Sequence, residues 1–429
     1  MGEKMKIFIG GYGRCNVHNE KDMIRTMCEA CLVEEVEYIE DADIILLIDT
    51  CVAVKDAIDV SFEWIDVVLQ YKKKNAKVIV SGCLTEKLNF DLTTKQKELL
   101  NKVTFIKSSD IIEYMANLLK YPISAETYKD FAFPFTISSP HSFMVSPVRG
   151  CIYHCSFCKT NYIDFILKSN PLEDLKHMAD DINKYDFKFS FIYINSSNLS
   201  LYGVDLYKKQ LAHEAIRILT SPKNIKYASV GALINWYPEL MQEVLKNEKI
   251  KDISLSLESG SPRIYELMNR PISLDNLIKV IKRIKEERPD IRINTEIIVG
   301  YPTETIDDLK RSIDLIYELD LYPLFVHPYM NSPLIPSSKL PQHSKEYCDY
   351  CSKYAEKLLQ KQKNDYLERI RNGEMYIVDK FDEWQTYQAL LIDGGVINIG
   401  YEELNKDYQV GDYLSPGSIN KLSRNRTIK

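Results

Sequence analysis

The first 120 residues alternate short, apolar, β-type runs with longer helical patterns, which is typical of a parallel α/β sheet. The apolar runs are Lys6–Gly10, Asp43–Asp49 and Lys77–Ser81. One cysteine follows shortly after each run: Cys15, Cys51 and Cys83. The carboxyl ends of parallel strands share one edge of an open sheet. These three cysteines are therefore predicted to converge, although they are far apart in the sequence.

A second and longer α/β series begins at Phe143, after the proline-containing segment Tyr121–His141, which indicates a linker. Its six apolar runs are Phe143–Val148, Phe189–Asn195, Lys226–Gly231, Asp252–Leu257, Ile291–Val299 and Tyr322–His327. Six β–α units predict a partial, open (β/α)6 barrel with its chemistry in the loops at the carboxyl ends of the strands.

The last part of the chain has a different pattern. A lysine-rich helix is predicted over Ser344–Arg371. It is followed by four strand-like runs at Met375–Asp379, Thr386–Asp393, Val396–Tyr401 and Asp412–Ile419. Gly-rich or charged turns separate these runs and predict a small antiparallel β-barrel. The fold class is thus α/β, with expected domains at residues 1–125, 137–370 and 373–429.

Composition narrows the class of protein. The 429 residues are 45% hydrophobic and 27% charged, as in ordinary globular proteins. No apolar stretch approaches the roughly 20 residues of a membrane span, and the N-terminus lacks the apolar core of a secretory signal. The ten cysteines therefore indicate metal or redox chemistry in a reducing, cytoplasmic compartment. The net charge of −6 gives the whole molecule no electrostatic attraction to a polyanion.

Three further cysteines form the most specific motif. Cys151, Cys155 and Cys158 have the spacing C-x3-C-x2-C directly after the first strand of the predicted barrel. A short loop can turn three thiolates toward one iron–sulfur cubane and leave the fourth iron open for a ligand. The alternative is a zinc knuckle, which needs a fourth ligand, and His154 is poorly placed beside Cys155 to supply it.

Together these segments resemble the radical S-adenosylmethionine (SAM) methylthiotransferases over essentially the whole chain. In the N-terminal domain the resemblance rests on Gly13–Asn16, Ile48–Val52 and Val80–Cys83. In the barrel it rests on Leu201–Tyr207, Ser261–Arg270 and Ile298–Thr305. The first two barrel segments are most similar to the branch that methylthiolates an aspartate of a small-subunit ribosomal protein. Leu391–Gly394 with Val410–Asp412 resembles the family's TRAM domain.

The resemblance implies SAM and two [4Fe–4S] clusters as cofactors. A cluster on Cys151, Cys155 and Cys158 would reduce SAM to a 5′-deoxyadenosyl radical, which abstracts hydrogen from an unactivated C–H bond. A cluster on Cys15, Cys51 and Cys83 would carry the sulfur, methylated by another SAM, to that carbon. A reducing system such as flavodoxin or ferredoxin would be a partner.

Five other residues are expected to contact SAM, and no catalytic side chain is singled out. The resemblance places Phe157 near the adenine. Asn195, Ser196, Glu258 and Glu296 lie at or near strand ends on the predicted active edge, with capping and turn chemistry as the alternative.

Several positions depart from the family pattern and bear on the substrate. Glu258 stands where the family usually has Gln, Asn294 stands where a basic residue is common, and Lys168–Pro171 replaces a more basic segment. Glu374–Lys429 carries nine acidic and six basic residues, a net charge of −3. This pattern favours a polypeptide substrate, from a ribosomal protein or a natural-product precursor peptide, over nucleic acid.

Two alternatives stay open. The same fold and cofactors serve a tRNA adenosine methylthiotransferase, and a non-catalytic iron–sulfur scaffold or redox sensor would keep the cysteines without the chemistry. Of the remaining cysteines, Cys28 and Cys31 are expected to pack in a core, and a third cluster on Cys348 and Cys351 is disfavoured.

Overall fold

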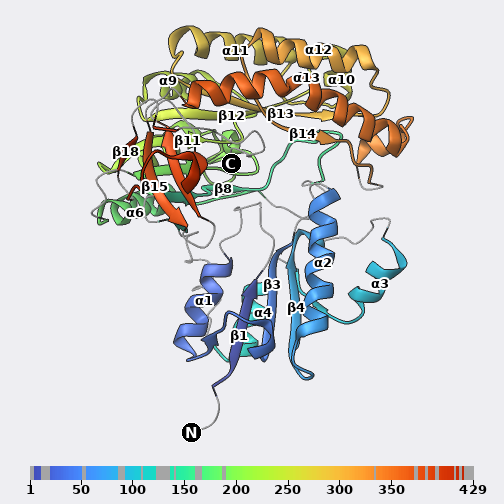
Figure 1. Ribbon diagram of the computed structural model, residues 1–429, viewed down its shortest axis with the longest axis vertical. Coiled ribbons are helices and arrows are strands. Elements are labelled where there is room, and N and C mark those ends of the chain that lie inside the picture. The colour runs from blue at the N-terminus through green and yellow to red at the C-terminus, as the bar shows by residue number, and fades with distance from the viewer. Residues whose placement is uncertain are drawn as a thin grey trace. The chain divides into compact units, whose positions relative to one another are not determined.

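The computed structural model describes residues 4–10, 20–50, 55–85, 92–107, 110–121, 136–139, 142–159, 167–185, 190–332, 335–371, 375–381, 385–391, 396–409, 412–414 and 418–419 (Figure 1). The chain divides into two compact units. Unit 1 comprises Met1–Pro134 with the short segments Lys159–Phe165 and Ser332–Ile335, and unit 2 comprises the rest. The three-domain boundaries expected from the sequence remain predictions.

Unit 1 is built on a parallel sheet, as predicted. Its strands are β1 (Lys6–Gly10), β2 (Glu34–Glu35), β3 (Ile44–Thr50), β4 (Lys77–Gly82) and β5 (Thr104–Phe105), in the order β2-β1-β3-β4-β5. All neighbouring strands in this order run parallel. The helices are α1 (Glu20–Ala30), η1 (Ile39–Asp41), α2 (Lys55–Tyr71), η2 (Cys83–Thr85), α3 (Thr94–Leu100) and α4 (Ile111–Leu119).

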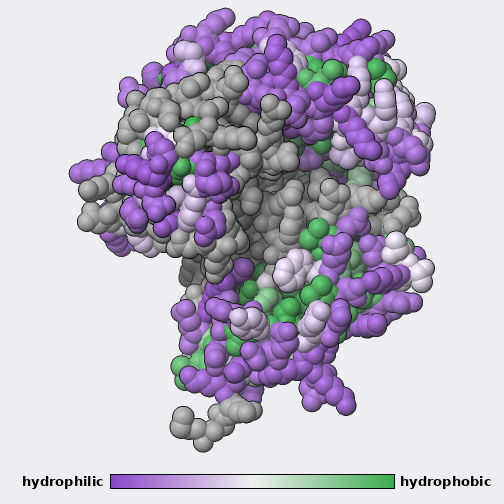
Figure 2. All heavy atoms as spheres, viewed as in Figure 1, coloured by the Kyte–Doolittle hydropathy of each residue, from purple (hydrophilic) through white to green (hydrophobic). Residues whose placement is uncertain are grey.

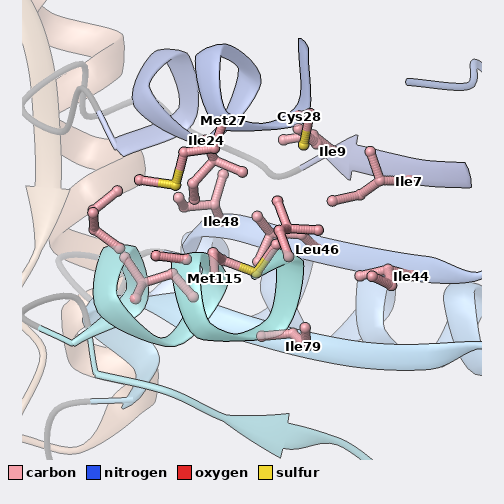
Figure 3. Packing of buried hydrophobic residues seen from close by; sticks show 14 residues of the cluster. Ile7, Ile9, Ile24, Met27, Cys28, Ile44, Leu46, Ile48, Ile79 and Met115 are labelled. Atoms are coloured by element: carbon pink, nitrogen blue, oxygen red, sulfur yellow. The ribbon is translucent and has the colours of Figure 1, made fainter. Parts of the chain in front are cut away.

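Alternation along the strands sets the core of unit 1. Ile44, Leu46 and Ile48 of β3 belong to the apolar cluster formed with α1 and α4 (Figure 3). Ile45 and Leu47, which alternate with them along the strand, are buried on the other face of the sheet. Both faces are buried, which is why the strand reads as a continuous apolar run.

Unit 2 contains a seven-stranded sheet in the order β14-β13-β12-β11-β10-β7-β6. The strands are β6 (Thr136–Ser139), β7 (Ser142–Val145), β10 (Ser190–Ile194), β11 (Ile225–Val230), β12 (Ile250–Glu258), β13 (Arg292–Val299) and β14 (Tyr322–Pro328). Six of them, β7 and β10 to β14, are parallel and follow the chain order, whereas β6 pairs antiparallel at the edge. The six predicted strands are therefore present. Closure of the sheet into a partial barrel remains a prediction.

Helices connect these strands in the expected alternation. They are α6 (Leu172–Asn183), η4 (Leu199–Leu201), α7 (Val204–Tyr207), α8 (Ala212–Thr220), α9 (Pro238–Lys246), α10 (Pro262–Leu267), α11 (Leu274–Glu287), α12 (Ile306–Glu318), η5 (Pro336–Lys339) and α13 (Lys345–Arg371). Local chemistry fixes their starts: Ser273 caps α11, and Thr305 with Asp308 forms a capping box on α12. A short hairpin of β8 (Val148–Arg149) and β9 (Lys168–Ser169) flanks the cysteine loop.

The tail forms a four-stranded antiparallel sheet in the order β17-β16-β15-β18. Its strands are β15 (Met375–Phe381), β16 (Thr386–Leu391), β17 (Val396–Gly400) and β18 (Tyr413–Leu414), with η7 (Tyr401–Glu403) after β17. Its apolar core includes Tyr322 of β14, so the tail shares a core with the parallel sheet. The predicted antiparallel strands are thus observed, and their closure into a barrel remains a prediction.

The surface gives no sign of a membrane span. None of the helices in the described part of the chain is both long and apolar enough to cross a bilayer. Figure 2 shows a mostly hydrophilic face on unit 2, with only scattered apolar side chains.

Candidate functional site

The cysteine loop, residues 151–158, follows β8 at the start of unit 2. Cys155 is buried, with 5% of its surface exposed, and Cys151 and Cys158 are half-buried. The backbone N–H of Cys158 donates to the carbonyl of Cys155 at 3.0 Å, which makes a tight turn between these two residues.

The end of α10 holds this loop in place. The N–H of Ser156 donates to the Met268 carbonyl at 2.9 Å, and its hydroxyl donates to the Leu267 carbonyl at 2.7 Å. Asn269 Nδ2 donates to the His154 carbonyl at 2.8 Å. The sequence 267–269 therefore fixes a loop more than 100 residues earlier in the chain, and that loop has no regular backbone pairing of its own.

A second anchor comes from Ser337 in η5. Its N–H and its hydroxyl both donate to the Ser156 carbonyl, at 3.0 and 2.8 Å. The Tyr301 hydroxyl lies 2.7 Å from that of Ser156. The loop is thus fixed before any ligand binds. Neither the anchor at the end of α10 nor the one at Ser337 could be identified from the sequence, because their residues form no motif and no periodic pattern.

Two nitrogen donors point at the cysteine sulfurs. Asn198 Nδ2 lies 3.5 Å from Cys151 Sγ, and Arg270 Nη1 lies 3.4 Å from Cys155 Sγ. Burial raises the pKa of the Cys155 thiol to about 11 and also raises the pKa of Cys151, while these two donors act in the opposite direction. A positively charged partner at these positions would favour the thiolate form.

The donor set fits a cluster better than a single ion. Within the described residues, no three Cys, His, Asp or Glu side chains gather closely enough to hold one metal ion. The zinc alternative needs such a group, because all of its ligands meet at one point. A cubane instead takes each thiolate at a different iron, so its ligands are spread more widely. Three soft sulfur donors, two of them with an N–H group beside the sulfur, are of the chemical type that an iron–sulfur cluster takes.

Glu258 and Arg270 form a buried ion pair next to the loop. Arg270 Nη1 lies 3.8 Å from Glu258 Oε1, and the two side chains are 4% and 9% exposed. Arg270 also donates to the Ser256 carbonyl at 3.0 Å and lies 5.7 Å from the ring centre of Phe157. The structure therefore brings together two of the predicted residues, Phe157 and Glu258, through an arginine.

Glu258 has an unusual environment. It follows a register shift in β12 and has a φ of +63°, in the left-handed region. Burial raises the pKa of its carboxyl to about 7, while Arg270 lowers it and Glu296 raises it further. Glu258 therefore lies at the carboxyl edge of the sheet in surroundings that favour its protonated form.

Glu296 faces the same edge from β13. Its carboxylate accepts from the Ser256 hydroxyl at 2.9 Å and lies 3.1 Å from Nε2 of His327 on β14. Burial alone would raise the pKa of Glu296, but the hydrogen bonds from His327 and Ser256 outweigh it and lower the pKa. The surroundings of Glu296 therefore favour its carboxylate form, whereas those of Glu258 favour the protonated form.

Asn195 and Ser196 directly follow β10, on the same edge of the sheet but beyond β11. Asn195 Oδ1 accepts from the N–H of Ser196 at 2.9 Å. The Ser196 hydroxyl is buried and has no hydrogen-bond partner among the described residues. A buried, unsatisfied hydroxyl at a strand end is suited to a ligand. The predicted SAM contacts thus lie along one edge, in two groups.

Two residues beside the cysteines were missed by sequence reasoning. Arg270 lay within a segment used for the family resemblance, but its sulfur contact depends on the fold of α10. Asn198 had no sequence signal, because its position depends on η4.

In unit 1, the ends of β3 and β4 are joined. The Thr50 hydroxyl donates to the Ser81 carbonyl at 2.7 Å and accepts from the Leu84 N–H at 3.3 Å. Cys83 opens η2 directly after β4, as predicted. Cys15 and Cys51 lie outside the described residues, so their convergence with Cys83 remains a prediction.

Four other cysteines in the described part of the chain lie outside the two proposed cluster sites. Cys28 belongs to the core of unit 1 and Cys31 packs against that core, which confirms the expectation for this pair (Figure 3). Cys348 and Cys351 are buried in α13, and among the described residues neither joins a metal-binding group.

Comparison with known proteins yields two family matches. Residues 145–316 match the Radical SAM superfamily, and residues 6–103 match the Uncharacterized protein family UPF0004. The first match contains the cysteine loop and the sheet edge described above, and the second contains Cys15, Cys51 and Cys83.

Relatives of both substrate types are similar to the chain. The "Ribosomal protein uS12 methylthiotransferase RimO" of Thermotoga sp. (strain RQ2) is 30% identical over 304 residues, covering 67% of this chain and 68% of the relative. The "tRNA-2-methylthio-N(6)-dimethylallyladenosine synthase" of Thermosipho africanus (strain TCF52B) is 27% identical over 330 residues, covering 73% of each.

The fold also has a solved counterpart. The cobalamin-dependent SAM radical enzyme OxsB, solved with aqua-cobalamin and SAM bound, superposes with a TM-score of 0.52 at 12% identity. The match covers 86% of this chain and 56% of OxsB. At this identity the likeness concerns the fold alone.

Proposed function

This chain belongs to the radical SAM methylthiotransferase family, and from that premise we propose that it inserts a methylthio group at an unactivated C–H bond of a polypeptide side chain. Members of the family use SAM and two [4Fe–4S] clusters. The modified residue of the substrate would be aspartate-like and would belong to a ribosomal protein or to a precursor peptide of a natural product.

Cys151, Cys155 and Cys158 would hold the cluster that binds SAM, and Cys15, Cys51 and Cys83 would hold the second cluster. When bound, these groups supply the one-electron chemistry and the sulfur. The single observation that carries the first assignment is the pair of N–H donors aimed at Cys151 and Cys155 on a loop fixed by Ser156.

The protein's own side chains would orient SAM at the carboxyl edge of the sheet. Phe157 lies on the cysteine loop beside Arg270. The unsatisfied hydroxyl of Ser196 is available to a polar group of the ligand, and Glu258 and Glu296 offer carboxyl oxygens at the same edge. Orientation and exclusion of water are what such a site contributes to radical chemistry.

The charge of the tail supports a polypeptide substrate. Residues Glu374–Lys429 have a net charge of −3, although the last nine residues of this span are basic. An RNA-binding domain needs several Lys or Arg side chains that contact phosphates, and an excess of acidic side chains repels those phosphates. Basic peptide segments are attracted instead. The tail would act as a TRAM-like substrate-binding domain.

The alternative substrate is a tRNA adenosine, as the name of the Thermosipho relative states for that protein. Measurements of direct binding to bulk tRNA and to basic peptides distinguish the polypeptide substrate from the tRNA substrate. Both the full chain and a chain ending at Arg371 are tested. We expect weak tRNA binding at all salt concentrations. Tight tRNA binding that falls by orders of magnitude between roughly 50 and 200 mM salt, and disappears without the tail, would select the tRNA function.

The partners follow from the same proposal. The one-electron donor would be a small carrier such as flavodoxin or ferredoxin, and the enzyme would work in the reducing cytoplasm, where its thiols stay available for iron. Detection of 5′-deoxyadenosine, the product of SAM cleavage, under anaerobic and reducing conditions distinguishes an enzyme from a non-catalytic scaffold.

A further inference from the structure

Arg270 is a cation with a largely buried side chain beside the cysteine loop. Its side chain is 4% exposed, and four partners fix it: the Cys155 sulfur at 3.4 Å, the Ser256 carbonyl at 3.0 Å, Glu258 at 3.8 Å and the Phe157 ring at 5.7 Å. These contacts hold the planar guanidinium beside the sulfur.

The contact is directed at a ligand sulfur and not only at the neighbouring carboxylate. Nη1 is the nitrogen nearest to both Cys155 and Glu258, so the cation is shared between a thiolate position and a carboxyl group. Hydrogen bonds to the ligand sulfurs and nearby charge set the reduction potential of an iron–sulfur cluster. Reduction adds one electron, and so one negative charge, to the cluster.

We propose that Arg270 is a positioning residue that raises the reduction potential of the cluster on Cys151, Cys155 and Cys158, and that Glu258 counteracts it. The inference rests on the proposed cysteine assignment. The cluster accepts one electron from an external one-electron donor, and no bond is broken in this step. The buried cation stabilises the added negative charge, because the surroundings screen it poorly. Glu258, paired with the same guanidinium, reduces this stabilisation when ionised.

The same sheet contains a matched control. Arg292 is also largely buried, pairs with the buried carboxylate of Asp252 and lies 5.8 Å from the ring centre of Tyr322. This pair occupies the amino ends of β12 and β13, six residues from Glu258 along β12, which is about 20 Å of strand. Arg270 and Arg292 therefore share burial, carboxylate and ring, and differ in the sulfur contact.

The experiment compares variants in a chain that also carries Cys15→Ala, Cys51→Ala and Cys83→Ala. The redox titration then reports on the proposed SAM-binding cluster alone. Each protein is reconstituted anaerobically, its iron is counted, and its cluster is titrated with dithionite in the presence of mediators while the EPR signal of the reduced state is followed. Glu258→Gln is made first. Adding Arg270→Met to it then removes the cation without leaving an unpaired buried carboxylate.

Relative to the parent, Glu258→Gln is expected to shift the potential upward. Relative to Glu258→Gln, the double variant is expected to lower the ratio of reduced to oxidised cluster about tenfold at a fixed potential, which is about 59 mV for a one-electron couple. The control step, from Asp252→Asn to Asp252→Asn with Arg292→Met, is expected to leave the potential unchanged.

An unchanged potential with full iron in the double variant would overturn the inference. Loss of iron from the double variant but not from Glu258→Gln would also overturn it, because Arg270 would then retain the loop and not tune the cluster. Cys155→Ala in the same background tests the premise separately. If that variant keeps its iron, the cysteine assignment fails, whatever the arginine variants show.

Discussion

Thr50 and Gly82 are packed so closely that a Cβ atom on Gly82 would lie 2.5 Å from the backbone nitrogen of Thr50. Gly82 also has a φ of +109°, a conformation that residues with side chains rarely adopt. Cys51 follows Thr50 in the sequence, and Cys83 follows Gly82. This contact therefore joins the two strand ends from which the proposed second cluster would take two of its ligands.

The change Gly82→Ala is expected to disturb that second site selectively. The new methyl group meets backbone and cannot be relieved by a side-chain rotation, so the ends of β3 and β4 must separate. Reconstituted iron should fall from about eight to about four per chain. SAM cleavage to 5′-deoxyadenosine should persist. Iron analysis and product chromatography measure the two effects.

Ser81→Ala is the matched control for this prediction. The Ser81 hydroxyl is buried and has no partner among the described residues, while its carbonyl still accepts from Thr50 after the change. Its iron content should match the parent. Full iron in Gly82→Ala would show that this strand contact does not support a cluster.

The change Gly231→Ala tests the edge at the end of β10. A Cβ atom there would lie 2.5 Å from Oδ1 of Asn195, so the amide must move from its bond to the Ser196 N–H. We expect SAM affinity to fall about tenfold, which corresponds to the loss of roughly one hydrogen bond to the ligand. Calorimetric titration of SAM into the reconstituted enzyme measures this.

The double variant Gly231→Ala with Asn195→Ala separates the clash from the binding effect. Removing the amide relieves the steric conflict, so thermal stability should recover while SAM affinity stays low. Both changes act on SAM through the same amide, so neither their effects on stability nor their effects on binding should add, and the double variant should bind SAM about as weakly as Gly231→Ala. Full SAM affinity in Asn195→Ala alone would remove Asn195 from the proposed site.

Much of the fold could be predicted because strand alternation and period are local properties. The runs at Lys6–Gly10 and Lys77–Ser81 became β1 and β4 with almost unchanged bounds. The segment Asp412–Ile419 was predicted as one strand; within its described residues Tyr413–Leu414 pairs as a strand, and Ile419 makes a separate bridge to Leu404. Tertiary contacts decide how such short strands pair, and the sequence pattern does not encode them.

The site was less predictable for the same reason. Cys155 and Glu258 could be identified from motif and strand position, but their connection through Arg270 depends on where α10 ends. Ser337 supports the loop from 181 residues away. Such contacts join segments that share neither a motif nor a period, so only the folded chain shows them.

The two proposed clusters should separate by mutation. Cys155→Ala should lose about half of the iron and all SAM cleavage, because the ligand that contacts Arg270 is removed from the SAM-binding cluster. Cys83→Ala should lose a similar amount of iron but keep SAM cleavage and lose methylthiolated product. Mass spectrometry of the substrate and assay of 5′-deoxyadenosine provide the two measurements. Persistent cleavage in Cys155→Ala would reject the assignment of that cluster.

A buried carboxyl group outside the proposed chemistry gives the clearest pH dependence. Glu304 is 1% exposed, and its Oε2 accepts from the Gly300 N–H at 2.5 Å, whereas Oε1 has no partner among the described residues. Burial raises the pKa of Glu304 to about 8, with Asp308 adding to it and the backbone N–H groups and Arg263 opposing it. Cys348, Cys351 and Tyr347 of α13 lie around the same carboxyl group.

A carboxyl group whose pKa is raised in the folded state stabilises the fold below its unfolded pKa, near 4.5, and loses that contribution as pH rises toward 8. Between pH 5 and pH 8 this loss amounts to about 3 kcal/mol. The Glu304→Gln variant keeps the shape of the side chain and cannot ionise. Its free energy of unfolding should therefore approach that of the parent near pH 5 and exceed it increasingly as the pH rises. Urea unfolding at several pH values measures the difference, and Glu287→Gln, at a half-exposed position on α11, is the control. If Glu304→Gln and the parent show the same pH dependence, Glu304 is already ionised in the folded protein and the burial argument fails.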